Sequence, residues 1–169
     1  MSTIAVTRSA TSSDIDSSRG RGVRALSDDG SLPAPPRLSA ALAALRLVVG
    51  SVFLTHGAQK IFIFGFGGVI SAFEAMGVPM AAIAGPMVAL VELFGGLALI
   101  LGFFTRPAAV GLAGVMLGAI LTVHLPAGFF LPDGMELVLN LFGAAVTLVL
   151  AGPGAYSVDT LRARRRELR

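Results

Sequence analysis

Six polar side chains lie within or at the ends of long apolar stretches of this chain and are its candidates for chemistry: Arg46, His56, Lys60, Glu92, His124 and Asn140. A charge in hydrocarbon costs at least about 2.5–3.5 kcal/mol on insertion scales, so each such group needs a partner or a function. Imidazole and carboxylate groups at membrane depth can hydrogen-bond a quinone carbonyl and carry its protons. We therefore treat the six as candidate ligand-binding residues. No catalytic residue is assigned, and no metal site is expected.

Depth along the helices indicates which of these groups can meet. With about 1.5 Å of rise per residue, Arg46 lies roughly 10 Å and Glu92 roughly 18 Å from the same face of the membrane. An arginine side chain bridges much of that difference, so we expect an ion pair between Arg46 and Glu92. Such a pair could fix the helix register or serve a ligand, and the sequence leaves both interpretations open.

A second group of polar residues lies near the opposite membrane face. The same count places His56 and His124 at roughly 24–25 Å. Asn140 lies close to that level, and Lys60 and Glu136 lie about one helical turn further out. Three interpretations fit this group: a pocket for a quinone headgroup, haem b held by the two histidines, or polar side chains that satisfy one another. Haem b is disfavoured because each histidine stands alone at the end of its helix.

The composition requires most of the chain to face lipid. Its 169 residues are 54% hydrophobic and only 14% charged, and most of the charge lies outside residues 38–152. A soluble protein surface would need many more charged side chains. Cysteine is absent, which excludes disulfides and thiolate-held metal or iron–sulfur centres. Any redox role would therefore need a bound cofactor or a partner protein.

The apolar stretches predict an all-α integral membrane protein, a four-transmembrane-helix bundle. About 20 apolar residues cross a hydrocarbon core of about 30 Å. We expect the four spans at about residues 39–60, 80–104, 107–125 and 135–151. The second span is the clearest because Glu92 is its only formal charge.

The segments between and beyond the spans have their own signals. Residues 62–68 are too rich in glycine for a stable helix, whereas 69–76 predict a short interfacial helix with Val69 facing lipid. The chain is thus expected to divide into three parts: a disordered cytoplasmic tail over 1–37, the transmembrane domain over 38–152, and a basic cytoplasmic tail over 153–169.

Positive charge outside the spans predicts the orientation of the bundle. The two tails carry five arginines each, and the turn between the second and third spans carries Arg106. Lys and Arg stay on the cytoplasmic side of a membrane, so both termini are expected inside (N-in/C-in). The arginines would then face the headgroups of the lipid bilayer. Nucleic-acid binding is not expected, because there is no soluble domain to carry a basic, aromatic surface.

Small residues predict where the helices touch. Gly114 and Gly118 form a small-xxx-small pair on the third span, which favours close packing of that helix. Gly50 and Gly96 offer similar sites on the first and second spans. At the tight turn before the third span, Thr105 is expected to cap the helix.

Several short motifs carry a family resemblance: Thr55-His56-Gly57-Ala58-Gln59-Lys60, Glu92-Leu93-Phe94-Gly95-Gly96, Thr122-Val123-His124 and Gly152-Pro153-Gly154-Ala155-Tyr156-Ser157-Val158-Asp159. With these motifs in this order, the chain resembles the DoxX family of membrane proteins over roughly residues 40–160. The resemblance implies a multi-pass protein of the bacterial inner membrane. It also implies relatives that act as a subunit of a thiosulfate:quinone oxidoreductase, or beside a superoxide dismutase and a sulfurtransferase.

Two function classes follow from the residues and the resemblance together. The first is a membrane subunit of a redox or oxidative-stress assembly, at most an oxidoreductase subunit, with a quinone pocket and a soluble partner on its cytoplasmic, arginine-rich end. The second is a non-catalytic membrane scaffold or a carrier of small solutes. Visible absorbance and extractable quinone in the purified protein would distinguish the first from the second.

Overall fold

The computed structural model describes residues 35–130 and 132–169, without the side chain of residue 167, and Ala34–Arg169 form one compact unit. All of its regular elements within these ranges are helical: α2 (Pro36–Ala58), η1 (Gln59–Phe64), α3 (Gly65–Ala75), α4 (Ala81–Leu101), α5 (Thr105–Ala119), η2 (Ile120–His124), α6 (Glu136–Ala151) and α7 (Val158–Glu167). The elements η1 and η2 are π-helices. The predicted disordered tail falls largely on residues outside the described part, and α2 begins at Pro36, inside its predicted end.

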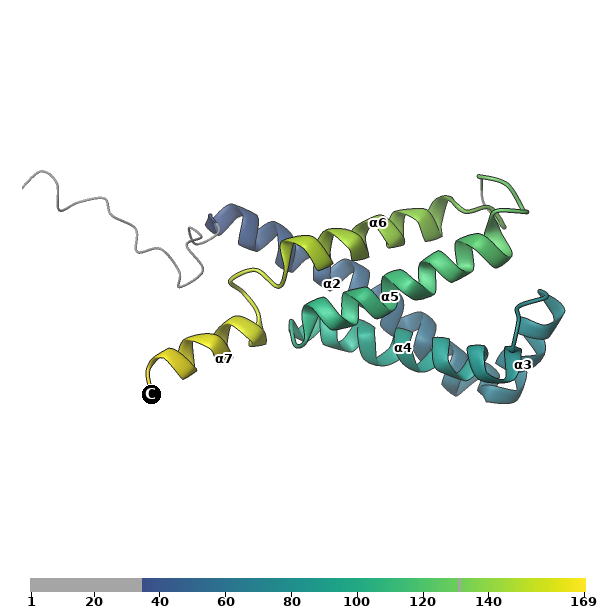
Figure 1. Ribbon diagram of the computed structural model, residues 1–169, viewed down its shortest axis with the longest axis horizontal. Helices are drawn as coiled ribbons and strands as arrows, with labels where there is room; N and C mark the ends of the chain where they lie inside the picture. The colour runs from purple at the N-terminus through teal and green to yellow at the C-terminus, as the bar shows by residue number, and fades with distance from the viewer. Residues whose placement is uncertain (1–34, 131) are drawn as a thin grey trace, which may run out of the picture. The chain divides into compact units, whose positions relative to one another are not determined.

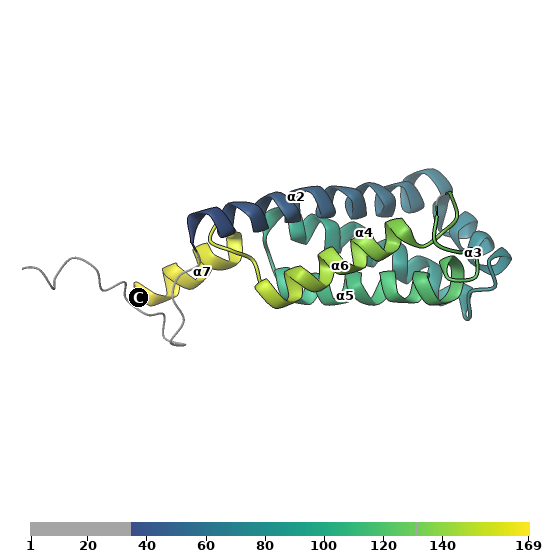
Figure 2. The ribbon, with the colours of Figure 1, turned by 90° about the horizontal axis from the view of Figure 1, so that it is seen from above.

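Four helices, α2, α4, α5 and α6, lie side by side in both views of the unit (Figures 1 and 2). The core between them is aliphatic with one aromatic ring, and its fully buried side chains include Leu99, Leu112, Leu148 and Phe53. Large apolar side chains also cover the outer faces of the helices, where they are exposed. Apolar side chains on both the inner and outer faces are typical of a bundle surrounded by lipid.

Three helical stretches are long and apolar enough to cross a membrane: Pro36–Ala75, Ala81–Leu101 and Thr105–His124. They contain the first three predicted spans. The fourth apolar helix, α6, has 16 residues and is about 24 Å long at 1.5 Å per residue, shorter than a hydrocarbon core of about 30 Å. The fold is therefore an all-helical multi-pass architecture.

The segment after the first span differs from the prediction. Residues 62–68 are helical: η1 ends at Phe64, and Gly65, with φ +67° and ψ 164°, redirects the chain into α3. Only glycine adopts such a conformation readily. Val69 does not face lipid, since it is 2% exposed and packs on Gly85 of α4. The missing side chain of Gly85 lets α3 fold back onto α4.

Glycines form the tight interface between α2 and α4, although only part of it was predicted. A Cβ on Gly57 would overlap the backbone of Leu93, and one on Gly96 would overlap the backbone of Leu54. Gly50 lies slightly further away: a Cβ added to it would stand 2.8 Å from the carbonyl oxygen of Gly96. These contacts fix the register of the two helices, because neither can slide without a backbone clash.

The small-residue pair on the third span does not make a helix contact within the described part of the chain. A Cβ on Gly114 or Gly118 would meet nothing within 4 Å. α5 instead turns Leu112 toward α4, where its side chain lies against Gly95. The prediction failed because the motif identifies a helix face that could pack closely, but does not say which face turns inward.

The C-terminal segment is docked on the bundle. The carboxylate of Asp159 accepts hydrogen bonds from the backbone amides of Phe104 and Thr105, both at 3.0 Å. It thereby caps the start of α5, the role that was predicted for Thr105. The Thr105 hydroxyl is buried and makes no hydrogen bond within the described residues. A carboxylate at a helix N-terminus satisfies its amides and complements the helix dipole.

Candidate functional site

A buried ion pair joins two of the six candidate residues. Lys60 Nζ, in the first turn of η1, lies 2.5 Å from Glu92 Oε2, in the middle of α4. The side chains are 20% and 5% exposed, respectively. The register explains the pairing: Gly57, three residues before Lys60, touches the backbone of Leu93, next to Glu92. The Glu92 carboxylate is thus neutralised by Lys60, which reaches it from the neighbouring helix.

The predicted pair between Arg46 and Glu92 is wrong. Arg46 lies against Gly102, ten residues beyond Glu92 and therefore about 15 Å away along α4. The depth count assumed that the cytoplasmic ends of α2 and α4 lie in one plane. The first turns of α2 instead extend past the turn between α4 and α5, so the count placed Arg46 too close to Glu92. Its Nη2 donates a hydrogen bond to the Tyr156 carbonyl, and Asp159 is its nearby opposite charge.

Arg46 holds the C-terminal segment to the bundle. The residue is only 2% exposed, and its Nε and Nη1 have no hydrogen-bond partner in the described part of the chain. A Cβ on Gly102 would overlap the guanidinium group, so the glycine makes room for it. Arg46 therefore serves as an anchor for residues 156–159, and no described contact links it to the other candidate residues.

Within the described residues, the three remaining candidates make no hydrogen bond or ion pair with Lys60 or Glu92. The exposed Asn140 donates from Nδ2 to the Glu136 carbonyl of its own helix, at 2.8 Å. His124 Nδ1 lies 2.8 Å from the Asp133 carbonyl, which ties the end of η2 to the following loop. His56 is exposed and lines a shallow depression that His124 does not reach.

The depression beside His56 is largely apolar and open. It has a volume of about 390 Å³, within the range of about 300–1,000 Å³ that is typical of small-molecule sites. Its lining comes from the end of α2 and from η1: Thr55, His56, Ala58, Gln59, Phe62 and Ile63. Imidazole and amide groups therefore stand beside an aromatic ring on an exposed surface, one helical turn from Lys60.

Both π-helices coincide with candidate polar residues. η1 contains Lys60, and η2 ends at His124. Single π turns within α-helices are frequent at functional sites, since the extra residue changes which side chains face a neighbour. Here η1 begins three residues after His56 and carries the lysine that reaches Glu92. Sequence reasoning could not have found either segment, because no residue pattern distinguishes a π turn from an α turn.

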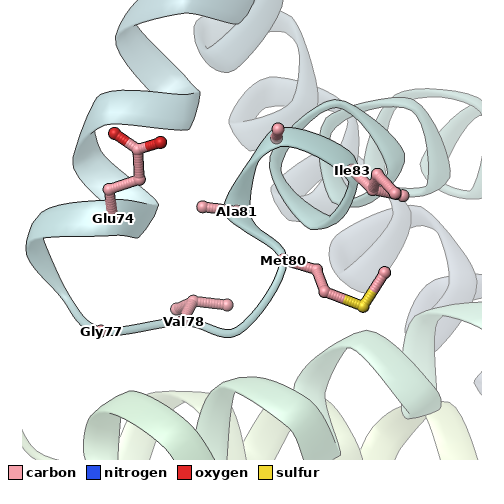
Figure 3. Close-up of a pocket in the computed structure, with 7 residues that line it drawn as sticks. Glu74, Gly77, Val78, Met80, Ala81 and Ile83 are labelled. Carbon is pink, nitrogen blue, oxygen red and sulfur yellow. The ribbon is translucent and has the colours of Figure 1, made fainter.

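A second depression lies at the turn between α3 and α4, and sequence reasoning did not select it. Its volume is about 570 Å³, and its lining includes Glu74, Val78, Met80 and Ile83. Figure 3 shows Glu74 and Met80 pointing in different directions, so polar groups do not converge there. Within the described residues, no three His, Cys, Asp or Glu side chains are grouped to hold a metal ion. We therefore do not treat this depression as a candidate functional site.

The fold and the site define a class: an all-helical, multi-pass membrane protein with a buried ion pair between two of its helices. Residues 41–125 match the pattern that defines the DoxX family. The chain belongs to the DoxX family, which confirms the resemblance seen in its motifs. The matched range contains both Lys60 and Glu92.

Several bacterial relatives align over most of their length. Inner membrane protein YqjF of Escherichia coli is 38% identical over 120 residues, covering 69% of this chain and 87% of that protein. An uncharacterized membrane protein of Mycobacterium tuberculosis is 33% identical, and the alignment covers 72% of this chain and 80% of that protein. A Bacillus subtilis protein named "Putative oxidoreductase CatD" is 32% identical, and the alignment covers 68% of this chain and 81% of that protein. No solved structure matches the chain.

Proposed function

We propose that this protein is the inner-membrane subunit of a redox assembly and that it binds a quinone headgroup in the depression beside His56. The proposal rests mainly on one observation: an imidazole in an exposed depression stands one helical turn from the buried Lys60–Glu92 pair. The Bacillus subtilis relative named "Putative oxidoreductase CatD" supports the redox class.

The lining of the depression fits a quinone. Phe62 and Ile63 offer apolar contact for the ring and the start of an isoprenoid tail. His56 and Gln59 offer donors for a carbonyl oxygen, whereas the Thr55 hydroxyl hydrogen is already donated to the Ser51 carbonyl. When bound, the quinone would accept the electrons and protons of the reaction. His56 would hold its carbonyl and pass a proton, and the Lys60–Glu92 pair would supply a polar group behind it.

The electrons would come from a soluble partner on the cytoplasmic side. The chain has no cysteine and thus no thiol redox group or thiolate-held cluster of its own. An assembly with a soluble electron donor is the arrangement that the family resemblance implies. The present chain would then contribute the membrane anchor and the quinone site.

The quinone site can be tested by titrating purified protein with decylubiquinone. We expect His56→Ala to weaken binding about tenfold, the equivalent of one hydrogen bond of about 1.4 kcal/mol. His124→Ala is the matched control and should leave the affinity unchanged, because His124 is occupied by its own loop. Equal affinities for the wild type and His56→Ala would refute the site.

We also propose that α6 is the fourth span, with both chain ends in the cytoplasm. Charge supports this orientation: α7, which carries Arg162 and Arg164, lies at the end of the unit where α5 begins, whereas α3, which carries Glu74, lies at the other end. The absence of cysteine makes the test direct. Ala163→Cys should react with a membrane-impermeant maleimide only in permeabilised cells, and Ala127→Cys in intact spheroplasts. Labelling of both on one side would remove α6 as a span.

A scaffold or small-solute carrier is the second candidate function. It is favoured by the local hydrogen bonds of His124 and Asn140, which satisfy these side chains without a ligand. A purified sample with no visible absorbance and no extractable quinone, and with no response to added quinone, would support this function over the first.

A further inference from the structure

The C-terminal helix α7 is fixed to the bundle by its first turn. The backbone amide of Asp159 donates to the Gly102 carbonyl at 3.0 Å, in addition to the two amides that its carboxylate caps. Ser157 caps α7 itself, accepting from the Thr160 amide at 3.1 Å. In Figures 1 and 2 the remainder of α7 leads away from the end of the bundle. The helix is therefore held at the position where the apolar helices α4 and α5 meet.

This end of the bundle is strongly basic. From residue 158 to the C-terminus the chain has five arginines and two acidic residues, and Asp159 is already engaged at the start of α5. The arginines Arg164, Arg165 and Arg166 are exposed. Arg106, at the start of α5, is exposed at the same end and lies beside Gly152. Among the described side chains, none of these arginines forms an ion pair with a carboxylate.

Exposed apolar side chains accompany these arginines. Arg162 stacks over the ring of Phe103, 4.5 Å from its centroid, and the Phe104 ring beside it is exposed. Leu161 in α7 and Leu168, directly after the end of that helix, are both exposed. Aromatic rings and leucines interleaved with arginines are typical of a surface that lies in the boundary between lipid tails and water.

We propose that α7 and the turn between α4 and α5 form a binding surface for the anionic headgroups of phospholipids. The headgroup layer begins where the apolar helices end and extends roughly 5–7 Å outward on each side. Arg106, at the start of α5, and Arg162, over Phe103, lie where the apolar helices end, and the exposed side chains of Arg164 to Arg166 are long enough to span the thickness of that layer. A lipid phosphate is thus the nearest anion of complementary charge, and each bound arginine should strengthen the attachment about fivefold.

The test uses the full-length protein in nanodiscs of phosphatidylcholine alone or mixed with phosphatidylglycerol. Backbone hydrogen exchange over residues 161–168 should slow at least fivefold in the anionic nanodiscs, and high salt should remove the effect. The variant R164Q/R165Q/R166Q should lose the effect, whereas the charge-matched R164K/R165K/R166K should keep most of it. Unchanged protection of the Phe104 and Thr105 amides would show that each variant is still docked.

Three outcomes would overturn the proposal. Equal exchange rates in neutral and anionic nanodiscs would exclude a contribution of headgroup charge. Equal protection by inorganic phosphate in neutral nanodiscs would show that a free anion, and not a lipid surface, is the ligand. Protection that appears only after a soluble cell fraction is added would assign the surface to an acidic protein. Retention of phosphatidylglycerol over phosphatidylcholine in native mass spectrometry, lost in the glutamine variant, would support it independently.

Discussion

Glu92 and Arg46 are both buried charges on apolar helices, yet they are stabilised in different ways. Glu92 is paired with a lysine at 2.5 Å, which brings a full opposite charge into direct contact. Arg46 donates to a backbone carbonyl and has Asp159 as its nearby opposite charge, with two of its nitrogens unpartnered in the described structure. The first arrangement joins two membrane helices, and the second joins a membrane helix to the C-terminal segment. Burial of a charge alone therefore does not identify a functional site.

The largest effect is expected from breaking the ion pair. Lys60→Ala leaves the Glu92 carboxylate buried without its partner, which should cost about 2–3 kcal/mol, less than for a fully buried pair because Lys60 is partly exposed. Thermal unfolding in detergent measures the loss. Because the double variant K60M/E92L removes both charges, it should recover most of the stability. A double variant as unstable as Lys60→Ala would show that the cost is not electrostatic.

A smaller effect is expected where Gly102 makes room for Arg46. Gly102→Ala places a side chain at φ +65° and against the guanidinium group, which should cost about 2 kcal/mol through backbone strain and the lost hydrogen bond to Tyr156. Hydrogen exchange should accelerate in residues 156–168 and remain unchanged near Lys60. The control is Gly114→Ala, which has open space around it and should be neutral or slightly stabilising. Faster exchange throughout the bundle would contradict a local anchor.

The smallest effect is expected from removing charge at the start of α5. Asp159→Asn retains a hydrogen-bond acceptor but loses the attraction to the helix dipole and to Arg46, which should cost about 0.5–1 kcal/mol. The exchange rates of the Phe104 and Thr105 amides report the change. A loss as large as that of Lys60→Ala would mean that the Arg46 region depends on a full ion pair, and the contrast between the two regions would disappear.

The sequence by itself determined the positions of the apolar helices to within a few residues, the family, and the two buried charges Arg46 and Glu92. These properties are local, since hydrophobicity and turn signals act over one helix length. The start of α3 at Gly65 could not be read from propensity, because it depends on the positive φ of Gly65 and on the packing of Val69 against Gly85. The same holds for the π-helices, which have no sequence signature.

Only the tertiary structure decided which polar groups meet. Partner choice depends on the axial offset between helices, and each residue of offset moves a side chain by about 1.5 Å. Gly57 against Leu93 sets that offset and brings Lys60, rather than Arg46, to Glu92. The extension of α2 beyond the turn after α4 carries Arg46 to Tyr156. These distances arise from contacts between residues far apart in the chain, so counting along single helices could list the charged residues but could not pair them.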